Sequence, residues 1–387
     1  MKKIPTTLFL ALLTLFSCVS KSQQFEKQII GEWTLTRSIN ENIPVKDTGD
    51  IPPPPPPPPG NYTKGYIFEQ NGTCEDKNGF FRLTRKAFDD TKVSFLGTKT
   101  RFIIVSDSLK IFDRSTYTWN NTKIYSIKDD SLILKTEDDI LEIYTKQIYH
   151  YRKNESYDKI IVSSSGCYGP CPIADICIER DGNVIYYGQR YNNPDGLFTS
   201  KISKKEYLNI ETSFKKADIP NLKENYIAGG SDMETITMTF IKNNKIVKTI
   251  TDYGHQSPAE LIWAYSSSRF LYENLKLVPY IYSNNNNYLL LIRNISFKTN
   301  QKIYILSKSE GFYLKMEFFN GKEVSQKFEK KYKIEYYNPD DKKEIIYSDG
   351  RYFTSTINGV QRTIDLGYNF LTQNDLIRKF RKINNFD

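Results

Sequence analysis

The cysteines in the interior of the chain are the residues best suited to chemistry. Cys167 and Cys171 are four positions apart in Gly166-Cys167-Tyr168-Gly169-Pro170-Cys171-Pro172. Gly169 and Pro170 favour a turn between the two thiols, so a disulfide would close a small loop. Redox work would need a thiol pKa lowered by a helix N-terminus or by cations, but a strand is expected after Cys171. The segment therefore predicts a structural disulfide, with free thiols, thiol–disulfide exchange and metal binding as alternatives.

Other residue types give little support for catalysis. The two histidines, His150 and His255, have neither a metal-binding nor a nucleophile-activating spacing. The paired acids Asp89-Asp90, Asp129-Asp130 and Asp340-Asp341 fall at expected turns, where solvation explains them. The chain has no nucleophile elbow, phosphate loop or dinucleotide fingerprint. We therefore predict no catalytic residue, no metal ligand and no cofactor, and we expect Cys177 to be a small buried side chain.

Size and charge limit the class of protein. The 387 residues suit two or three domains, and 39% hydrophobic with 14% aromatic residues is enough to build cores. The net charge is +9, but the lysines are scattered among acids, so we expect no nucleic-acid partner. One local concentration of charge comprises Arg378, Lys379, Arg381 and Lys382, which we interpret as a solvated helix face.

The N-terminus indicates export. Lys2 and Lys3 precede an apolar stretch, residues 4–16, that is too short to span a bilayer as a stable helix. The following Leu15-Phe16-Ser17-Cys18 resembles the lipobox of bacterial lipoproteins. The resemblance implies a signal peptide over 1–17 and a lipid on Cys18, followed by a polar tether over 18–25. We therefore expect a membrane-anchored protein of the cell envelope, facing the periplasm or the surface.

Residues 26–150 have the pattern of an antiparallel β domain. Short alternating strands, beginning around Trp33, are separated by turn pairs, and the region shows no convincing helical period. Eight prolines at 52–59 form a polyproline loop, which we interpret as a replication-slippage product, with a spacer or groove ligand as the alternative.

The first strand of this domain carries a family resemblance. Gly31-Glu32-Trp33 resembles the opening of lipocalin-like domains. The resemblance implies a barrel whose closed end contains Gly31 and Trp33. Such a barrel is filled by its own side chains or holds one small apolar ligand, and we favour the filled barrel.

Residues 151–280 predict an α+β domain of two hairpins and two helices. The hairpins turn at Asp181-Gly182 and Asn243-Asn244, and the helices begin after Ser203 and at Ser257-Pro258. Together with the Cys167–Pro172 segment and Asp252-Tyr253-Gly254, this order resembles a bacterial exported family, domain of unknown function 6438, over about 155–275. The resemblance implies an architecture and no activity. We expect 26–150 and 155–275 to fold as separate units.

Residues 281–387 predict a further antiparallel β-rich region. Expected strands include 312–318 and 344–347, and a short helix is expected near 375–382. The whole chain is thus expected to be multidomain and mainly β. The function that fits is binding or scaffolding at the envelope, with the membrane and a protein as partners. The alternatives are a carrier of a small apolar ligand in the barrel, and a thiol–disulfide enzyme that uses Cys167 and Cys171.

Overall fold

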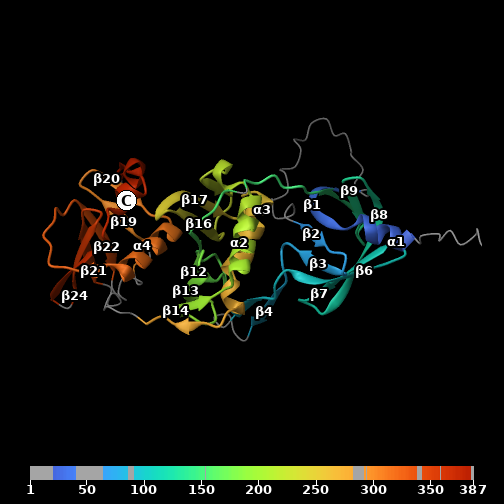
Figure 1. Cartoon of the computed structure of the whole chain (residues 1–387), viewed down its shortest axis with the longest axis horizontal. Helices are drawn as coiled ribbons and strands as arrows, with labels where there is room; N and C mark the ends of the chain where they lie inside the picture. The colour runs from blue at the N-terminus through green and yellow to red at the C-terminus, as the bar shows by residue number, and fades with distance from the viewer. Residues whose placement is uncertain are drawn as a thin grey trace, which may run out of the picture. The chain divides into compact units, whose positions relative to one another are not determined.

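The computed structural model describes residues 21–40, 64–85, 91–152, 154–281, 292, 294–337, 342–357 and 359–384. Cys18 and the polyproline run lie outside these residues. The protein is mainly β, with few helices, as the sequence predicted (Figure 1). It divides into two compact units, one comprising Met1–Phe80 with Leu96–Ile148 and the other Phe81–Phe95 with Tyr149–Asp387.

Unit 1 is a closed barrel of eight antiparallel strands, which confirms the predicted architecture. The order around the barrel is β1-β10-β9-β8-β7-β6-β3-β2. The elements are α1 (Lys21–Gln28), β1 (Gly31–Asn40), β2 (Gly65–Phe68), β3 (Thr73–Asp76), β6 (Lys99–Val105), β7 (Ser108–Asp113), β8 (Thr118–Lys128), β9 (Ser131–Lys135) and β10 (Ile140–Lys146).

Large aromatic side chains occupy the barrel interior. Trp33, Phe68 and Tyr144 are fully buried. The ring of Phe68 lies 4.9 Å from that of Phe102, measured between centroids. The indole Nε1 of Trp33 donates to the carbonyl oxygen of Ile29 at 2.6 Å. This bond ties the residue that follows α1 to the buried tryptophan. The interior is thus packed with the barrel's own side chains.

A hairpin that interrupts the barrel sequence belongs to unit 2. It consists of β4 (Phe81–Arg85) and β5 (Thr91–Phe95). The rings of Phe81 and Phe95 lie 5.5 and 5.6 Å from the ring of Phe270. The backbone N–H of Phe95 donates to the carboxylate of Glu273 at 2.6 Å. The chain therefore passes between the two units three times.

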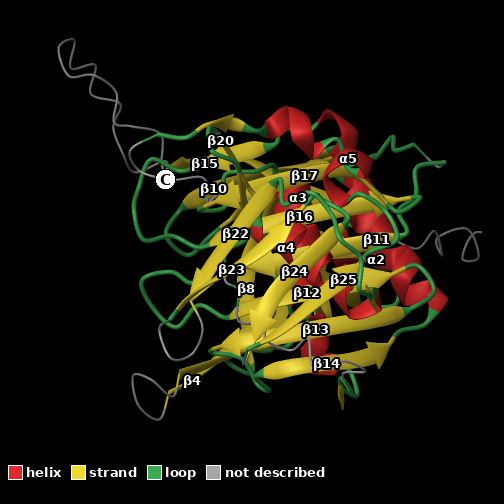
Figure 2. Ribbon diagram, turned by 90° about the vertical axis from the view of Figure 1, so that its left-hand side faces the viewer, coloured by secondary structure: helices red, strands yellow, loops and turns green. Residues whose placement is uncertain are grey.

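The centre of unit 2 is an eight-stranded sheet in the order β15-β17-β16-β11-β12-β13-β14-β18. Figure 2 shows β12, β13 and β14 side by side. All neighbouring pairs are antiparallel except β15 with β17. The strands are β11 (Lys159–Ser164), β12 (Ile173–Glu179), β13 (Asn183–Arg190), β14 (Gly196–Lys201), β15 (Asn225–Ile227), β16 (Thr235–Lys242), β17 (Lys245–Tyr253) and β18 (Val278–Pro279).

Two helices lie against one face of this sheet, in the predicted order. They are α2 (Lys204–Lys216) and α3 (Ala259–Arg269), and 3-10 turns follow them at Ile219–Asn221 and Leu271–Asn274. Ser203 caps α2 in the predicted capping box with Glu206. Ser257 does not cap α3, because its hydroxyl donates to the buried carboxylate of Asp252 at 2.5 Å instead.

The opposite face of the central sheet is also buried. Ile160 and Val162 of β11 join the core beneath α2 and α3. Ile161 of β11 and Cys177 of β12 join a second core, which includes residues of the C-terminal region. Both faces of these strands are therefore covered, so apolar residues run consecutively over 160–162 and 176–178 rather than alternating with polar ones. The burial of Cys177 confirms its predicted role.

A helix, and not the predicted strand, occupies 312–318. This helix is α4 (Lys308–Asn320), which packs against β11, β12 and β16. Ser307 and Glu310 form a capping box at its start. Phe312, Tyr313 and Leu314 are consecutive and all buried, so the helix has no polar stripe to give it a helical period.

The C-terminal sheet has the order β21-β25-β24-β23-β22-β19-β20-β26. Its strands are β19 (Ser296–Lys298), β20 (Lys302–Ile305), β21 (Lys322–Glu323), β22 (Tyr332–Tyr337), β23 (Lys343–Ser348), β24 (Tyr352–Ile357), β25 (Val360–Asp365) and β26 (Arg381–Lys382). The expected helix over 375–382 is only a 3-10 turn at Leu376–Lys379, preceded by α5 (Phe370–Gln373). The basic cluster is therefore split between this turn and β26.

The central and C-terminal sheets fall in one unit and share one hydrophobic core. The domain boundaries expected near residues 150 and 280 would separate parts that fold independently, and this stays a prediction. Among the described residues, no helix combines the length and the apolar character needed to cross a membrane.

Candidate functional site

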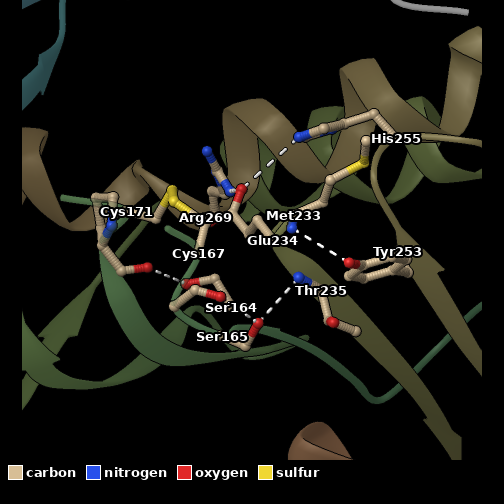
Figure 3. The surroundings of a disulfide bond; sticks show 12 residues. Ser164, Ser165, Cys167, Cys171, Met233, Glu234, Thr235, Tyr253, His255 and Arg269 are labelled. Carbon is tan, nitrogen blue, oxygen red and sulfur yellow. Dashed lines mark hydrogen bonds and ion pairs between the residues drawn. A yellow bond between two sulfur atoms is a disulfide. The ribbon is translucent and has the colours of Figure 1, made fainter. Parts of the chain in front are cut away.

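A disulfide closes the loop between β11 and β12. Cys167 and Cys171 are bonded, and their α-carbons lie 5.6 Å apart (Figure 3). This distance falls within the range of about 4.4–6.8 Å that the bond requires. Both cysteines are half-buried. The pair that the sequence singled out is therefore held at disulfide distance.

Side-chain hydrogen bonds fix the base of this loop on the β12 side. The hydroxyl of Ser164 donates to the carbonyl oxygen of Pro172 at 2.7 Å. The same hydroxyl accepts the backbone N–H of Ala174 at 3.2 Å. These two bonds tie the last residue of β11 to the chain that leaves the disulfide.

The loop is also tied to the start of β16. The backbone N–H of Thr235 donates to the Ser165 hydroxyl at 2.9 Å, and the Ser165 N–H donates to the Thr235 carbonyl at 2.9 Å. The N–H of Tyr168 donates to the carbonyl oxygen of Asp232 at 3.0 Å. The side chain of Tyr168 is 89% exposed. A rigid backbone thus carries an aromatic ring that the described residues leave in solvent.

A buried carboxylate lies beside the disulfide. Glu234 is 7% exposed, and its Oε2 accepts from Nη1 of Arg269 at 2.5 Å. Nε2 of His255 lies 3.7 Å from the same oxygen. The guanidinium offsets the cost of burying this carboxylate. Oε1 of Glu234 and Nε of Arg269 have no hydrogen-bond partner among the described residues.

His255 joins this ion pair to a second buried acid. Its Nδ1 lies 2.7 Å from the hydroxyl oxygen of Tyr265, and that hydroxyl donates to Oδ2 of Asp252 at 3.1 Å. Oδ1 of Asp252 accepts the N–H of Gln256 at 2.7 Å. Burial lowers the pKa of His255, although Glu234 opposes the shift, so the imidazole is neutral at neutral pH. Burial, reinforced by Asp252, raises the pKa of Tyr265.

These contacts favour a conformational role over a chemical one. His255 has φ of 56°, in the left-handed region, and its ring is engaged with Tyr265. The hydroxyl of Ser257 donates to the Asp252 carboxylate and not to an imidazole, so this arrangement lacks the hydroxyl–imidazole hydrogen bond that activates a serine nucleophile. The cluster holds residues 252–257 against α3 and against Glu234, which directly precedes β16.

Few features of the structure support thiol–disulfide exchange or metal binding at Cys167 and Cys171. Cys171 is followed by Pro172 and β12, so the segment after it supplies a strand and not the helix N-terminus that would lower a thiol pKa. Burial raises the pKa of the thiols of Cys74 and Cys177. Within the described ranges, no three side chains of the His, Cys, Asp and Glu types form a metal-binding group.

The structure also locates the two residues predicted at the closed end of the barrel. Trp33 lies inside the barrel beneath Ile29, and Gly31 has φ of 136°, which a larger residue rarely adopts. Cys18 lies outside the described residues. Nothing in the sequence pairs Glu234 with Arg269, because 35 positions separate them and only the fold brings them together.

A cavity of about 790 Å³ lies beside α1 of the barrel. It is lined by Glu26, Lys27, Ile30, Gln70, Gly72, Phe102, Ile103 and Ile104. Four lining residues are apolar, whereas Glu26, Lys27 and Gln70 are polar or charged, so the cavity wall mixes both kinds of side chain.

Comparison with known proteins gives one informative match. Residues 158–272 match a family described as "Domain of unknown function (DUF6438)", which agrees with the resemblance found in the sequence. No curated protein matches the chain. One solved structure, the Helicobacter pylori beta clamp in complex with carprofen, aligns at 10% identity over 69% of this chain and 88% of that chain. Its TM-score of 0.10 is too low to support any argument about fold.

Proposed function

We propose that the protein is a lipid-anchored component of the cell envelope that acts by binding a protein partner, without catalysis. The disulfide loop is the centre of the proposed binding surface. The observation that carries this proposal is Tyr168, which is 89% exposed on a loop fixed by a disulfide and by hydrogen bonds on both sides. A pre-ordered aromatic side chain loses little entropy on binding, so it is a good anchor for an interface.

The contacts around the loop support binding over catalysis. Arg269 is paired with Glu234, and His255 is engaged with Tyr265. The guanidinium and the imidazole beside the disulfide are thus engaged in contacts that hold Glu234 and His255 against α3, although Oε1 of Glu234 and Nε of Arg269 have no partner among the described residues. The proposed location rests on the lipobox-like segment that ends at Cys18.

The carrier alternative has weaker support. It requires an empty barrel, but Trp33, Phe68 and Tyr144 fill the interior with fully buried rings. A ligand inside the barrel would have to displace these side chains, at a cost of several kcal/mol for each buried aromatic.

Photo-crosslinking in the intact producing cells tests the proposal. A photoreactive amino acid replaces Tyr168 in the full chain. In the matched control the same amino acid replaces Tyr337, which is 63% exposed on β22. We expect one discrete adduct from position 168 and none of the same size from position 337. Because the disulfide orders the loop, Cys167→Ser with Cys171→Ser should reduce the yield of that adduct at unchanged protein level.

Two results would contradict this proposal. Equal, diffuse labelling from both positions would mean that Tyr168 lies on no specific interface. A reducible adduct that accumulates on Cys167 in the Cys171→Ser variant would instead support thiol–disulfide exchange, because the missing second thiol could no longer resolve a mixed disulfide.

A further inference from the structure

The outer wall of the barrel at β6, β7 and β8 has an unusual composition. Lys99, Arg101, Ile103 and Val105 of β6 are exposed, and they alternate with buried residues that face the core. The strand register places Phe112 of β7 beside Arg101 and directly opposite Trp119 of β8. Cationic, aromatic and aliphatic side chains therefore share one face, which we call the β6–β8 face.

Positive charge dominates this segment. Its basic residues between 99 and 128 are Lys99, Arg101, Lys110, Arg114, Lys123 and Lys128. Its acids are Asp107 and Asp113, while Asp129 and Asp130 follow directly and Glu75 of β3 pairs with Lys99 in the strand register. The carboxylate of Asp113 accepts the backbone N–H of Ser115 at 2.6 Å, and that of Asp107 lies 3.9 Å from Lys123. The excess of cations favours an anionic partner.

Arg101 is held flat on the face by two rings. Its guanidinium carbon lies 5.1 Å from the ring centroid of Phe112 and 5.7 Å from that of Trp119. A shallow cleft of about 290 Å³ opens beside it, lined by Lys99, Thr100, Arg101, Phe112 and Arg114. Three cations around one cleft are suited to a phosphate group.

Apolar and aromatic side chains extend beyond this cleft. Ile103 and Val105 are exposed on β6, and Tyr117 and Tyr125 are exposed next to or on β8. Aliphatic groups gain by entering the acyl region, whereas Trp and Tyr are enriched at the level of the lipid headgroups. A convex wall that carries both, together with cations, fits a broad lipid surface better than a single polar chain.

We propose that the β6–β8 face lies on an anionic phospholipid bilayer and forms a second membrane contact of the protein. Helix α1 packs against β6 and β8 and begins at Lys21, three positions after Cys18. The placement of this face near a bilayer rests on the proposed lipid anchor. A lipid at Cys18 would hold the face near the bilayer, so a weak contact would act at a high effective concentration.

Tryptophan fluorescence of the full chain tests this inference. The chain has three tryptophans, of which Trp33 is 0%, Trp263 8% and Trp119 38% exposed. Trp119 is therefore the one that responds to a new environment. Vesicles of mixed phosphatidylglycerol and phosphatidylcholine should shift its emission to the blue, and brominated acyl chains should quench it. Phosphatidylcholine vesicles alone should do neither, and added salt should weaken the response.

Two double variants change the net charge by the same amount, one on the β6–β8 face and one elsewhere. Together they distinguish a specific contact of this face from a general effect of the protein's charge. Lys99→Glu with Arg101→Glu should weaken partitioning into anionic vesicles by about tenfold or more. Lys330→Glu with Lys331→Glu, at exposed positions of the C-terminal region, should leave the Trp119 response unchanged.

Flotation with phosphatidylcholine vesicles measures the lipid anchor separately. If the protein floats but anionic vesicles leave Trp119 unmoved, the inference is wrong and the anchor stands. If the protein does not float but Trp119 responds to anionic vesicles, the proposed lipid anchor is wrong and the proposed bilayer contact of the β6–β8 face is supported. If a soluble anionic polysaccharide shifts Trp119 and vesicles do not, the partner is a glycan and the bilayer assignment is overturned.

Discussion

Replacing Cys167 and Cys171 together by serine should destabilise unit 2 by about 2 kcal/mol. The two residues are four positions apart, so the loop that the disulfide closes is very short. The chain-entropy relation gives about 6–7 cal/mol/K for a loop of this length, or about 2 kcal/mol at 25 °C. The bonds that Ser164 and Ser165 make would remain, so the loop should loosen without releasing β11.

Calorimetry of the full chain measures this effect with an internal control. For a unit of this size, 2 kcal/mol should lower the melting temperature by about 4–8 °C. The barrel transition should not move, because neither cysteine belongs to unit 1. Reduction of the wild-type protein should reproduce the shift. A loss of about 4 kcal/mol or more would refute the entropic reasoning, because it would mean that the disulfide supports the packing of the central sheet. An unchanged melting temperature would refute it too.

Four further results are expected. Ser307→Ala should cost about 1 kcal/mol in urea unfolding, because it removes the cap of α4. Burial raises the pKa of Asp76 to about 6, so ionising it should destabilise the barrel as the pH rises from about 4 to about 6. Asp76→Asn should therefore raise the barrel's melting temperature at neutral pH but not in acid. The sequence led us to expect that residues 155–275 fold as a separate unit, but alone they would uncover Ile161 and Cys177, so we now expect this fragment to bind a hydrophobic dye and to unfold without cooperativity. Cys18→Ala should abolish fatty-acid labelling, and equal labelling would disprove lipidation at that residue.

Local signals in the sequence predicted the local structure well. Asn243 and Asn244 adopt positive φ at the predicted hairpin turn, since asparagine tolerates the left-handed region. Ser203 with Glu206 marks the start of α2, because both partners of the capping box lie within one turn of helix. Such features depend on residues a few positions apart, and the sequence displays them directly.

Long-range packing explains what the sequence could not show. Helix α4 has no polar face, because the core surrounds it, and its aromatic run resembled a strand. Glu234 and Arg269 are ordinary charged residues until β16 and α3 place them together. The contact of Phe95 with Phe270 joins residues 175 positions apart, and the sequence around neither residue indicates the other as its partner.

The hairpin β4–β5 affects how the molecule would respond to proteolysis. A protease that cuts once between residues 149 and 152 would leave the hairpin covalently joined to the barrel sequence. The same hairpin would still be packed through Phe81 and Phe95 on Phe270, within unit 2. The two fragments would therefore remain associated as a complementing pair, and their separation would require the hairpin to leave its place. A protein nicked at this linker would keep both of its units joined without an intact covalent link between them.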